Sequence, residues 1–183
     1  TADATAGGSI LFNQLGGGSL TVNASAGNNA IINVYNGGNL IIETISAVNT
    51  VNLVVHNGSI IDGLDATGPP PPADIAALNL ILSAVNGIGS LGNPIETQVS
   101  NLQATNTISG DISIENIGSL NASSVSNTGG NVYLTVHSDL TIGTILGNYV
   151  YLTANSGAII DGNDGANNVT ASSLILSAAN GIG

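Results

Sequence analysis

The chain has 183 residues, contains no Lys, Arg, Cys, Met or Trp, and carries a formal net charge of −11. Without cationic side chains it lacks the usual means of neutralising phosphates, which excludes ordinary nucleic-acid binding and disfavours anionic membrane surfaces. A hydrophobic fraction of 43% is too high for a disordered acidic tail, so we expect the chain to fold. No segment approaches the roughly 18 consecutive apolar residues of a membrane-spanning helix, and we expect no membrane insertion.

Short segments in which apolar and polar residues alternate recur along the chain. Period-two alternation over a few residues is typical of half-buried β-strands, and the Gly, Asn, Asp and Ser between the segments favour turns. ADIAAL (Ala73–Leu78) could form one helical turn; otherwise the sequence predicts an all-β protein. The predicted strands begin near Ser9, Ser19, Ala30, Leu40, Val51, Ser59 and Leu78, and later near Asp111, Val132, Leu140, Val150, Ala158 and Leu174.

A longer repeat of about 100 residues contains these strands. NTVNLVVHNGSIIDG (Asn49–Gly63) returns as NYVYLTANSGAIIDG (Asn148–Gly162), and Asn79–Gly89 is matched by Ser173–Gly183. The spacing differs because the first copy carries an insert around GPPPP (Gly68–Pro72), which we expect to protrude as a stiff loop. We place the first super-repeat at about 7–108 and a truncated second at about 109–183. This predicts one continuous segment, residues 1–183, cut from a longer array.

Strands spaced 9–11 residues apart could form either a β-sandwich or a β-solenoid. Two strands with their turns make a coil of about 20 residues, and five such coils would fill the 100-residue unit. The chain has one Phe and four Tyr, few for a sandwich core, whereas a narrow solenoid can stack Ile, Leu, Val and Ala. Its 25 Asn residues suit side-chain ladders between coils. We therefore predict a right-handed parallel β-helix.

The recurring phrases also resemble a known group of proteins. LILSAVNGIGSLGNPIET (Leu80–Thr97), NLQATNTISGDISIENIGSL (Asn101–Leu120) and GAIIDGNDGANNVTASSL (Gly157–Leu174) resemble the filamentous-haemagglutinin-like "β-strand repeat" regions of giant bacterial surface exoproteins. The resemblance covers almost the whole chain. It implies an extracellular right-handed parallel β-helix in an adhesin or cell-surface fibre, with no catalytic residues in the repeats.

Paired aspartates occur at matching turns of the two copies. IIDGLD contributes Asp62 and Asp65, and IIDGNDG contributes Asp161 and Asp164. Aspartate and backbone oxygens suit calcium, although the spacing fits neither an EF-hand nor the GGxGxD repeat. Asp-Gly turns without a ligand are the simpler interpretation. We therefore predict no dedicated metal or cofactor site, with weak Ca²⁺ association at these turns as an open alternative.

Other chemically capable residues are few and scattered. His56 and His137 lie at non-equivalent places in the repeat, and we expect each on a solvent-facing strand position or at a turn. Asp111 and Glu115 lie four residues apart in one predicted strand, about 13 Å by strand rise, whereas glycoside hydrolysis requires two carboxylates about 5–10 Å apart. No catalytic or cofactor-binding residue is therefore predicted, and we expect a protein that is not an enzyme.

The sequence thus favours a structural role. We expect an extracellular rod or fibre element of a repetitive bacterial surface protein, whose partner is itself through end-to-end coil stacking or chain continuity. The alternative is a module that binds surface glycans or a host surface. Tyr133, Tyr149 and Tyr151 are the one aromatic cluster available to it.

Overall fold

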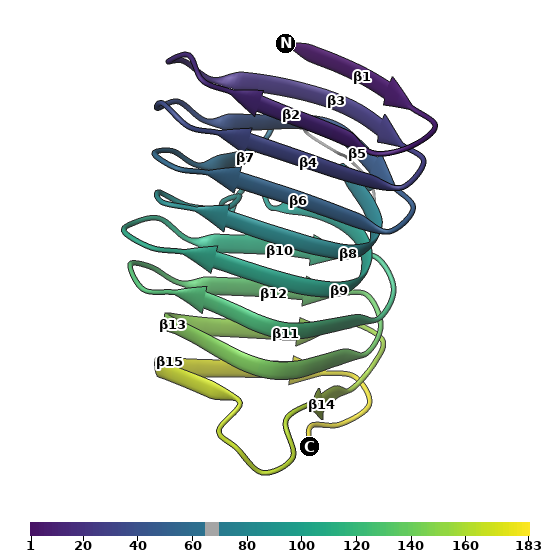
Figure 1. Cartoon of the computed structure of the whole chain (residues 1–183). Coiled ribbons are helices and arrows are strands. Elements are labelled where there is room, and N and C mark those ends of the chain that lie inside the picture. The colour runs from purple at the N-terminus through teal and green to yellow at the C-terminus, as the bar shows by residue number, and fades with distance from the viewer. Residues whose placement is uncertain (65–69) are drawn as a thin grey trace.

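The computed structural model describes residues 1–64 and 70–183, which wind into a right-handed parallel β-solenoid of about nine turns (Figure 1). Each turn takes about 20 residues, and the ladders between strands are parallel. Parallel ladders exclude the β-sandwich and confirm the predicted fold class. Among the described residues there is no helix that could cross a membrane.

Within residues 1–64 and 70–183, fifteen strands make up the stack. Their bounds are β1 Ala2–Ala6, β2 Ile10–Gln14, β3 Leu20–Ala26, β4 Asn29–Val34, β5 Leu40–Ala47, β6 Thr50–Val55, β7 Ile60–Asp62, β8 Ile75–Ala84, β9 Ile95–Asn106, β10 Ile112–Asn116, β11 Leu120–Asn127, β12 Val132–Val136, β13 Leu140–Ala154, β14 Ile159–Asp161 and β15 Val169–Ala178.

The solenoid has two main faces, which we name after the view in Figure 1. The front face contains β2, β4, β6, the later parts of β8 and β9, then β11 and the first part of β13. The back face contains β3, β5 and β7, followed by β10, β12, the last part of β13 and β15. Strands β8, β9 and β13 are long because each continues around an edge from one face to the other.

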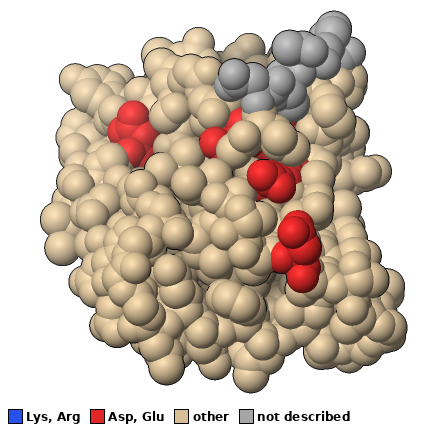
Figure 2. All heavy atoms as spheres, turned by 90° about the horizontal axis from the view of Figure 1, so that it is seen from above, with Lys and Arg blue, Asp and Glu red and all other residues tan. Residues whose placement is uncertain are grey.

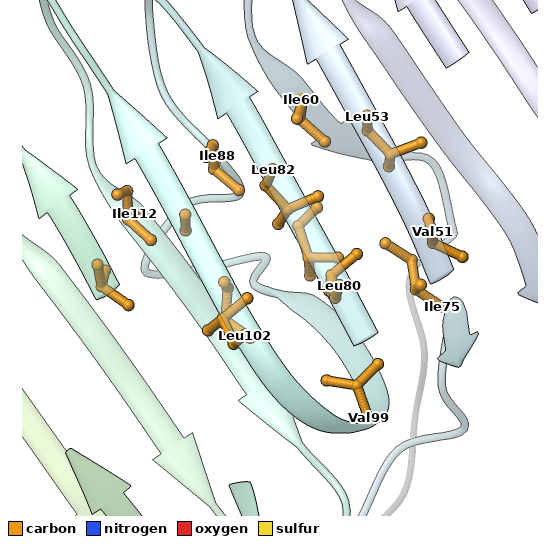
Figure 3. Packing of buried hydrophobic residues seen from close by; sticks show 14 of the residues in the cluster. Val51, Leu53, Ile60, Ile75, Leu80, Leu82, Ile88, Val99, Leu102 and Ile112 are labelled. Atoms are coloured by element: carbon orange, nitrogen blue, oxygen red, sulfur yellow. The ribbon is translucent and has the colours of Figure 1, made fainter. Parts of the chain in front are cut away.

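Aliphatic side chains stack from turn to turn in continuous columns, because ladder partners in a parallel sheet point the same way. Burying them contributes roughly 25 cal/mol for each Å² of apolar surface. In Figure 3, Leu80 and Leu82 project into the same interior as Ile60 and Ile88 of the back face. The back-face column is Leu20, Leu40, Ile60, Ile88, Ile112, Val132, Val150 and Leu174, and a front-face column is Ile10, Ala30, Val51, Leu80, Leu102, Ala122 and Ile142.

Asparagine side chains form ladders beside these columns, as the sequence predicts. Asn101 Nδ2 donates to Asn79 Oδ1 at 3.0 Å, and Asn121 Nδ2 donates to Asn101 Oδ1 at 3.3 Å. Asn106 and Asn127 form a second, buried ladder, with Asn106 Nδ2 donating to Asn127 Oδ1 at 3.0 Å. The amides bond along the solenoid axis and satisfy one another between coils.

Two details of the sequence prediction were wrong. Ala73–Leu78 makes no helical turn, because most of it lies in β8, where Ile75 pairs with Ile45 and with Thr97. The 100-residue unit also does not span five whole coils. Four ladder steps lead from Ile60 to Val150 on the back face, and Ile159 lies half a turn further, on the front face. Repeated sequence therefore lies on opposite faces.

The proline-rich insert lies between β7 and β8. Gly68 and Pro69 lie outside the described residues, as does Asp65. Pro70–Pro72 belong to no strand, and Pro71 is buried. Seen from the N-terminal end, the surface carries isolated acidic groups and no basic group (Figure 2).

Candidate functional site

Three carboxylates meet at one place in the solenoid. Asp62, Asp74 and Glu96 each place an oxygen within 4.8 Å of the others. All three side chains are buried, with 5%, 4% and 4% of their surface exposed. Buried acids are rare in proteins unless they are paired, and this chain has no Lys or Arg to pair with them.

Asp62 reaches the interior because of the strand that precedes it. β7 has the burial pattern of a half-buried strand, and its ladder pairs Asp62 with buried Ile42, so the carboxylate takes an inward-facing position. The chain then turns. Gly63 N donates to Ile42 O at 2.7 Å, and Leu64 N donates to Asp62 Oδ1 at 2.8 Å. The second bond is an Asx turn, in which an aspartate carboxylate caps its own backbone.

Asp74 and Glu96 are held by the ladders of β8 and β9. Ile45 N donates to Asp74 O at 2.7 Å, and Asp74 N donates to Glu96 O at 2.9 Å. Glu96 lies between the buried residues Ile95 and Thr97 near the start of β9, and its backbone N donates to Asp74 Oδ2 at 3.3 Å. Asp74 and Glu96 therefore belong to successive turns that are locked in register.

The electrostatics of the cluster favour neutral groups. Burial, a hydrogen bond with the Glu96 side chain and the negative charges of Asp62 and Glu96 together raise the pKa of Asp74 to about 8, with burial the largest cause. Burial also raises the pKa of Glu96, reinforced by the charges of Asp62 and Glu115. Burial disfavours the charged form of a carboxyl group, and neighbouring negative charges add to the effect.

The second copy of the repeat builds the same turn with a different polar pair. Asp161 occupies the place of Asp62: Gly162 N donates to Ile142 O at 2.9 Å, and Asn163 N donates to Asp161 Oδ1 at 2.9 Å. Asn168 occupies the place of Asp74, since its carbonyl accepts from Ile145 N at 2.7 Å. Asn168 Nδ2 donates to Asp161 Oδ1 at 2.9 Å. These bonds lower the pKa of Asp161, the bond from Asn163 most strongly and that from Asn168 next.

The aspartate pairs expected from the sequence have different outcomes. Asp62 joins the buried cluster, while Asp65 lies outside the described residues. Asp161 and Asp164 are both exposed, and Asp164 has a left-handed backbone with φ of 49°. In the second copy, a turn without a ligand therefore accounts for both Asp161 and Asp164. Sequence reasoning missed Asp74 and Glu96, whose only signal is that Asp74 stands where the second copy has Asn168.

The two histidines lie apart, each at the turn after a front- or back-face strand. His56 follows β6, is exposed, and stacks on Tyr35 with ring centroids 4.5 Å apart. His137 follows β12, and its Nε2 lies 2.6 Å from Glu115 Oε1. Asp111 has a different partner from Glu115. Asp111 precedes β10, and its Oδ1 accepts a hydrogen bond of 2.9 Å from Asn131 N, which precedes β12. The structure therefore joins Glu115 to His137 rather than to Asp111.

Three of the four tyrosines lie on the back face, in β12 and β13. Tyr133 and Tyr151 are ladder partners, and Tyr149 lies two residues before Tyr151, on the same side of the strand. Tyr149 is 59% exposed and Tyr151 is 43% exposed. These rings form an exposed aromatic patch.

Comparison of the chain with protein-family models, with curated proteins and with solved structures found no match.

Proposed function

We propose that this chain is a structural element of an extracellular rod or fibre in a repetitive bacterial cell-surface protein, and that it is not an enzyme. The observation that carries the proposal is the unbroken aliphatic columns, which run through successive turns on both faces. In a stack of this kind, the hydrogen bonds between strands run along the axis. Its resemblance to filamentous-haemagglutinin-like repeats supports the same role.

The composition suits exposure outside the cell. A chain without Lys or Arg offers trypsin-like proteases no cleavage site, and one without Cys or Met lacks the side chains most easily oxidised. Its stability comes from burial and ladder bonds, which salt does not screen as it screens surface ion pairs.

The proposed partner is another coil of the same kind. At the last described turn, a hollow of about 330 Å³ is lined by apolar side chains that include Ile159, Leu176 and Ile182. Leu174 and Ile182 are 45% and 55% exposed, although their equivalents Leu80 and Ile88 are buried. A further coil, from a continuing chain or from a second copy, would bury them and pair with the open edge of β15.

Location on the cell tests this proposal. Antibodies against the chain, with immunogold electron microscopy of intact producing cells, should label surface rods or fibres, and proteinase K added to those cells should remove the label. Label confined to the cell interior and resistant to the protease would contradict the proposed role.

A second function is favoured by the tyrosine patch. Exposed aromatic rings are common platforms for sugars, so the back face at Tyr133, Tyr149 and Tyr151 is the candidate surface for a glycan-binding module. Glycan-array binding that is lost in Tyr149→Ala and Tyr151→Ala, and kept in Tyr35→Ala, would support it. Equal binding by all three variants would exclude this patch.

A further inference from the structure

We propose that Asp62, Asp74 and Glu96 bind one calcium ion inside the solenoid, and that this ion fastens two successive turns together. The proposed structural role does not require a metal site. The aspartate turns expected from the sequence contain only Asp62 of the three residues, because Asp74 and Glu96 lie outside them. The proposal does not depend on where the protein is located.

The negative charge of the cluster is the first observation that supports a cation. The cluster gathers three buried carboxyl groups, and ionising several carboxylates together in the interior is unfavourable without a nearby positive charge. The chain has no Lys or Arg. Ionisation of the cluster therefore leaves negative charge in the interior that no Lys or Arg balances. A divalent cation balances that charge without relying on protons.

The separations of the three oxygens also suit calcium. Some point lies within about 2.8 Å of all three oxygens, because points at most 4.8 Å apart fit inside a circle whose radius is at most 4.8 Å divided by √3. Calcium–oxygen bonds in proteins are about 2.3–2.6 Å long, so small side-chain movements are sufficient. Carboxylates bind calcium through one or both oxygens, which gives this cluster three to six ligands. Magnesium is a poorer fit, since it requires bonds of about 2.1 Å and retains its waters.

A buried oxygen of Glu96 is the third observation that supports the site. Glu96 Oε2 is buried and has no hydrogen-bond partner among the described residues, although the Glu96 side chain is only 4% exposed. A buried polar atom without a partner costs about 1–3 kcal/mol. A cation in the cluster would give this oxygen a partner.

The second copy of the repeat supplies an internal control. There, the Asn168 amide donates a hydrogen bond to the Asp161 carboxylate, so this carboxylate has a side-chain donor. Asp74, at the place of Asn168, has no such donor when ionised. The first copy therefore has a carboxylate, Asp74, where the second copy has an amide donor, and a bound cation explains this difference.

The location of the cluster indicates what the ion does. Asp62 ends β7 and Asp74 precedes β8, so these residues lie on either side of the insert of the first copy, while Glu96 belongs to the following turn. A single ion would hold the two ends of the insert together and join them to the next coil. The calcium ion would then connect the two strands, β7 and β8, between which the insert lies.

Calorimetric titration of the metal-free chain with CaCl₂ tests the proposal, together with thermal unfolding in CaCl₂ and in EGTA. Asp74→Asn copies the second repeat and is expected to fold, which far-UV circular dichroism checks. Glu96→Gln is the second test variant. Asp164→Asn is the matched control, because it removes one exposed acidic charge from the other copy.

We expect one calcium per chain, and a rise in Tm of about 5–10 °C at calcium concentrations about 100-fold above Kd. Affinity should fall at least tenfold in Asp74→Asn and Glu96→Gln and stay within twofold in Asp164→Asn, with MgCl₂ giving a smaller stabilisation. Absence of calcium binding by the wild-type chain, or equal binding by wild type and Asp74→Asn, would overturn the proposal.

Discussion

Asp74 and Asn168 occupy equivalent positions in the two copies of the repeat, since the carbonyl of each accepts a hydrogen bond of 2.7 Å from Ile45 and Ile145, respectively. Their side chains differ in one respect that matters: the Asn168 amide donates a hydrogen bond to Asp161, and an ionised Asp74 cannot donate to Asp62. The backbone is thus repeated while the polar chemistry is not.

The pH dependence of stability follows from this difference. Burial, with the Glu96 hydrogen bond and the charges of Asp62 and Glu96, raises the pKa of Asp74 to about 8 from its ordinary 3.8. The folded chain then binds the proton more tightly than the unfolded chain. With EGTA present, this stabilising contribution is complete below about pH 4 and is lost as the pH rises through about 8.

Denaturant unfolding between pH 4 and pH 9 measures this effect. Wild type should lose stability relative to Asp74→Asn over that range, by an amount on the order of several kcal/mol. Asp164→Asn should follow wild type, which separates the cluster from the general repulsion of an acidic chain. Parallel curves for wild type and Asp74→Asn would show that Asp74 does not keep its proton in the folded state.

The aliphatic columns predict a sharp contrast within one strand. Leu80 is 1% exposed and stacks between Val51 and Leu102, whereas Leu78 in the same strand is 49% exposed. Leu80→Ala should cost about 2–5 kcal/mol of unfolding free energy, because it leaves a cavity in the column. Leu78→Ala should stay within about 0.5 kcal/mol. Similar losses for the two variants, measured by denaturant unfolding, would mean that Leu80 is not a column residue.

Much of this fold could be predicted from the sequence, because alternation identifies strands and 20-residue spacing identifies coils. The strands missed were β1, β9 and β11, where small or polar residues weaken the pattern: β11 reads LNASSVSN, and only its packing makes Ala122 a core residue. The half-turn offset of the repeat was also not predictable, since it depends on how many residues each turn absorbs.

The candidate site was less accessible to sequence reasoning. Asp62, Asp74 and Glu96 are separated by 11 and 21 intervening residues, and the coil stack alone brings them together. Pairing Asp62 with Asp65 followed local spacing, which suits a turn. The partners that the structure gives Asp62 are Asp74, across the insert, and Glu96, in the following turn, and a single sequence does not give the register between coils.

Glycine is required at one turn by the approach of the coil above. Gly38 has φ of 92°, and a Cβ there would lie 2.2 Å from the backbone carbon and oxygen of Gly18. Gly38→Ala should therefore cost at least about 2 kcal/mol, from the strained backbone and from the displaced coil. Gly16→Ala, where a Cβ would meet nothing within 4 Å, should be nearly neutral. If thermal unfolding finds both variants nearly neutral, the coils are not packed as closely as described.

The buried asparagine ladder makes a further prediction. Asn106 is fully buried, accepts from Gly87 N at 2.8 Å, and donates to Ser109 O at 2.8 Å and to Asn127. Asn106→Ala should cost about 3 kcal/mol, because it leaves several buried groups unpaired. Asn121→Ala, at an exposed ladder position, should cost less than about 1 kcal/mol. Chemical unfolding of the two variants gives the comparison, and a cost for Asn106→Ala no larger than that for Asn121→Ala would contradict it.

Register along the rod can be measured directly with spin labels, since the chain has no cysteine of its own. Leu11, Gln103 and Thr144 are exposed positions connected by front-face ladders. Gln103 lies four ladder steps from Leu11, through Ile31, Asn52 and Ile81, and Thr144 lies two steps further, through Ser124. At about 4.8 Å for each step, the two separations are about 19 Å and about 29 Å.

The most direct test of stacked coils is therefore pulsed electron–electron double resonance on two labelled variants, Leu11→Cys/Gln103→Cys and Leu11→Cys/Thr144→Cys. The account predicts two narrow distance distributions whose means differ by about 10 Å, a difference in which the length of the label largely cancels. Broad distributions, or a Thr144 distance equal to or shorter than the Gln103 distance, would contradict it.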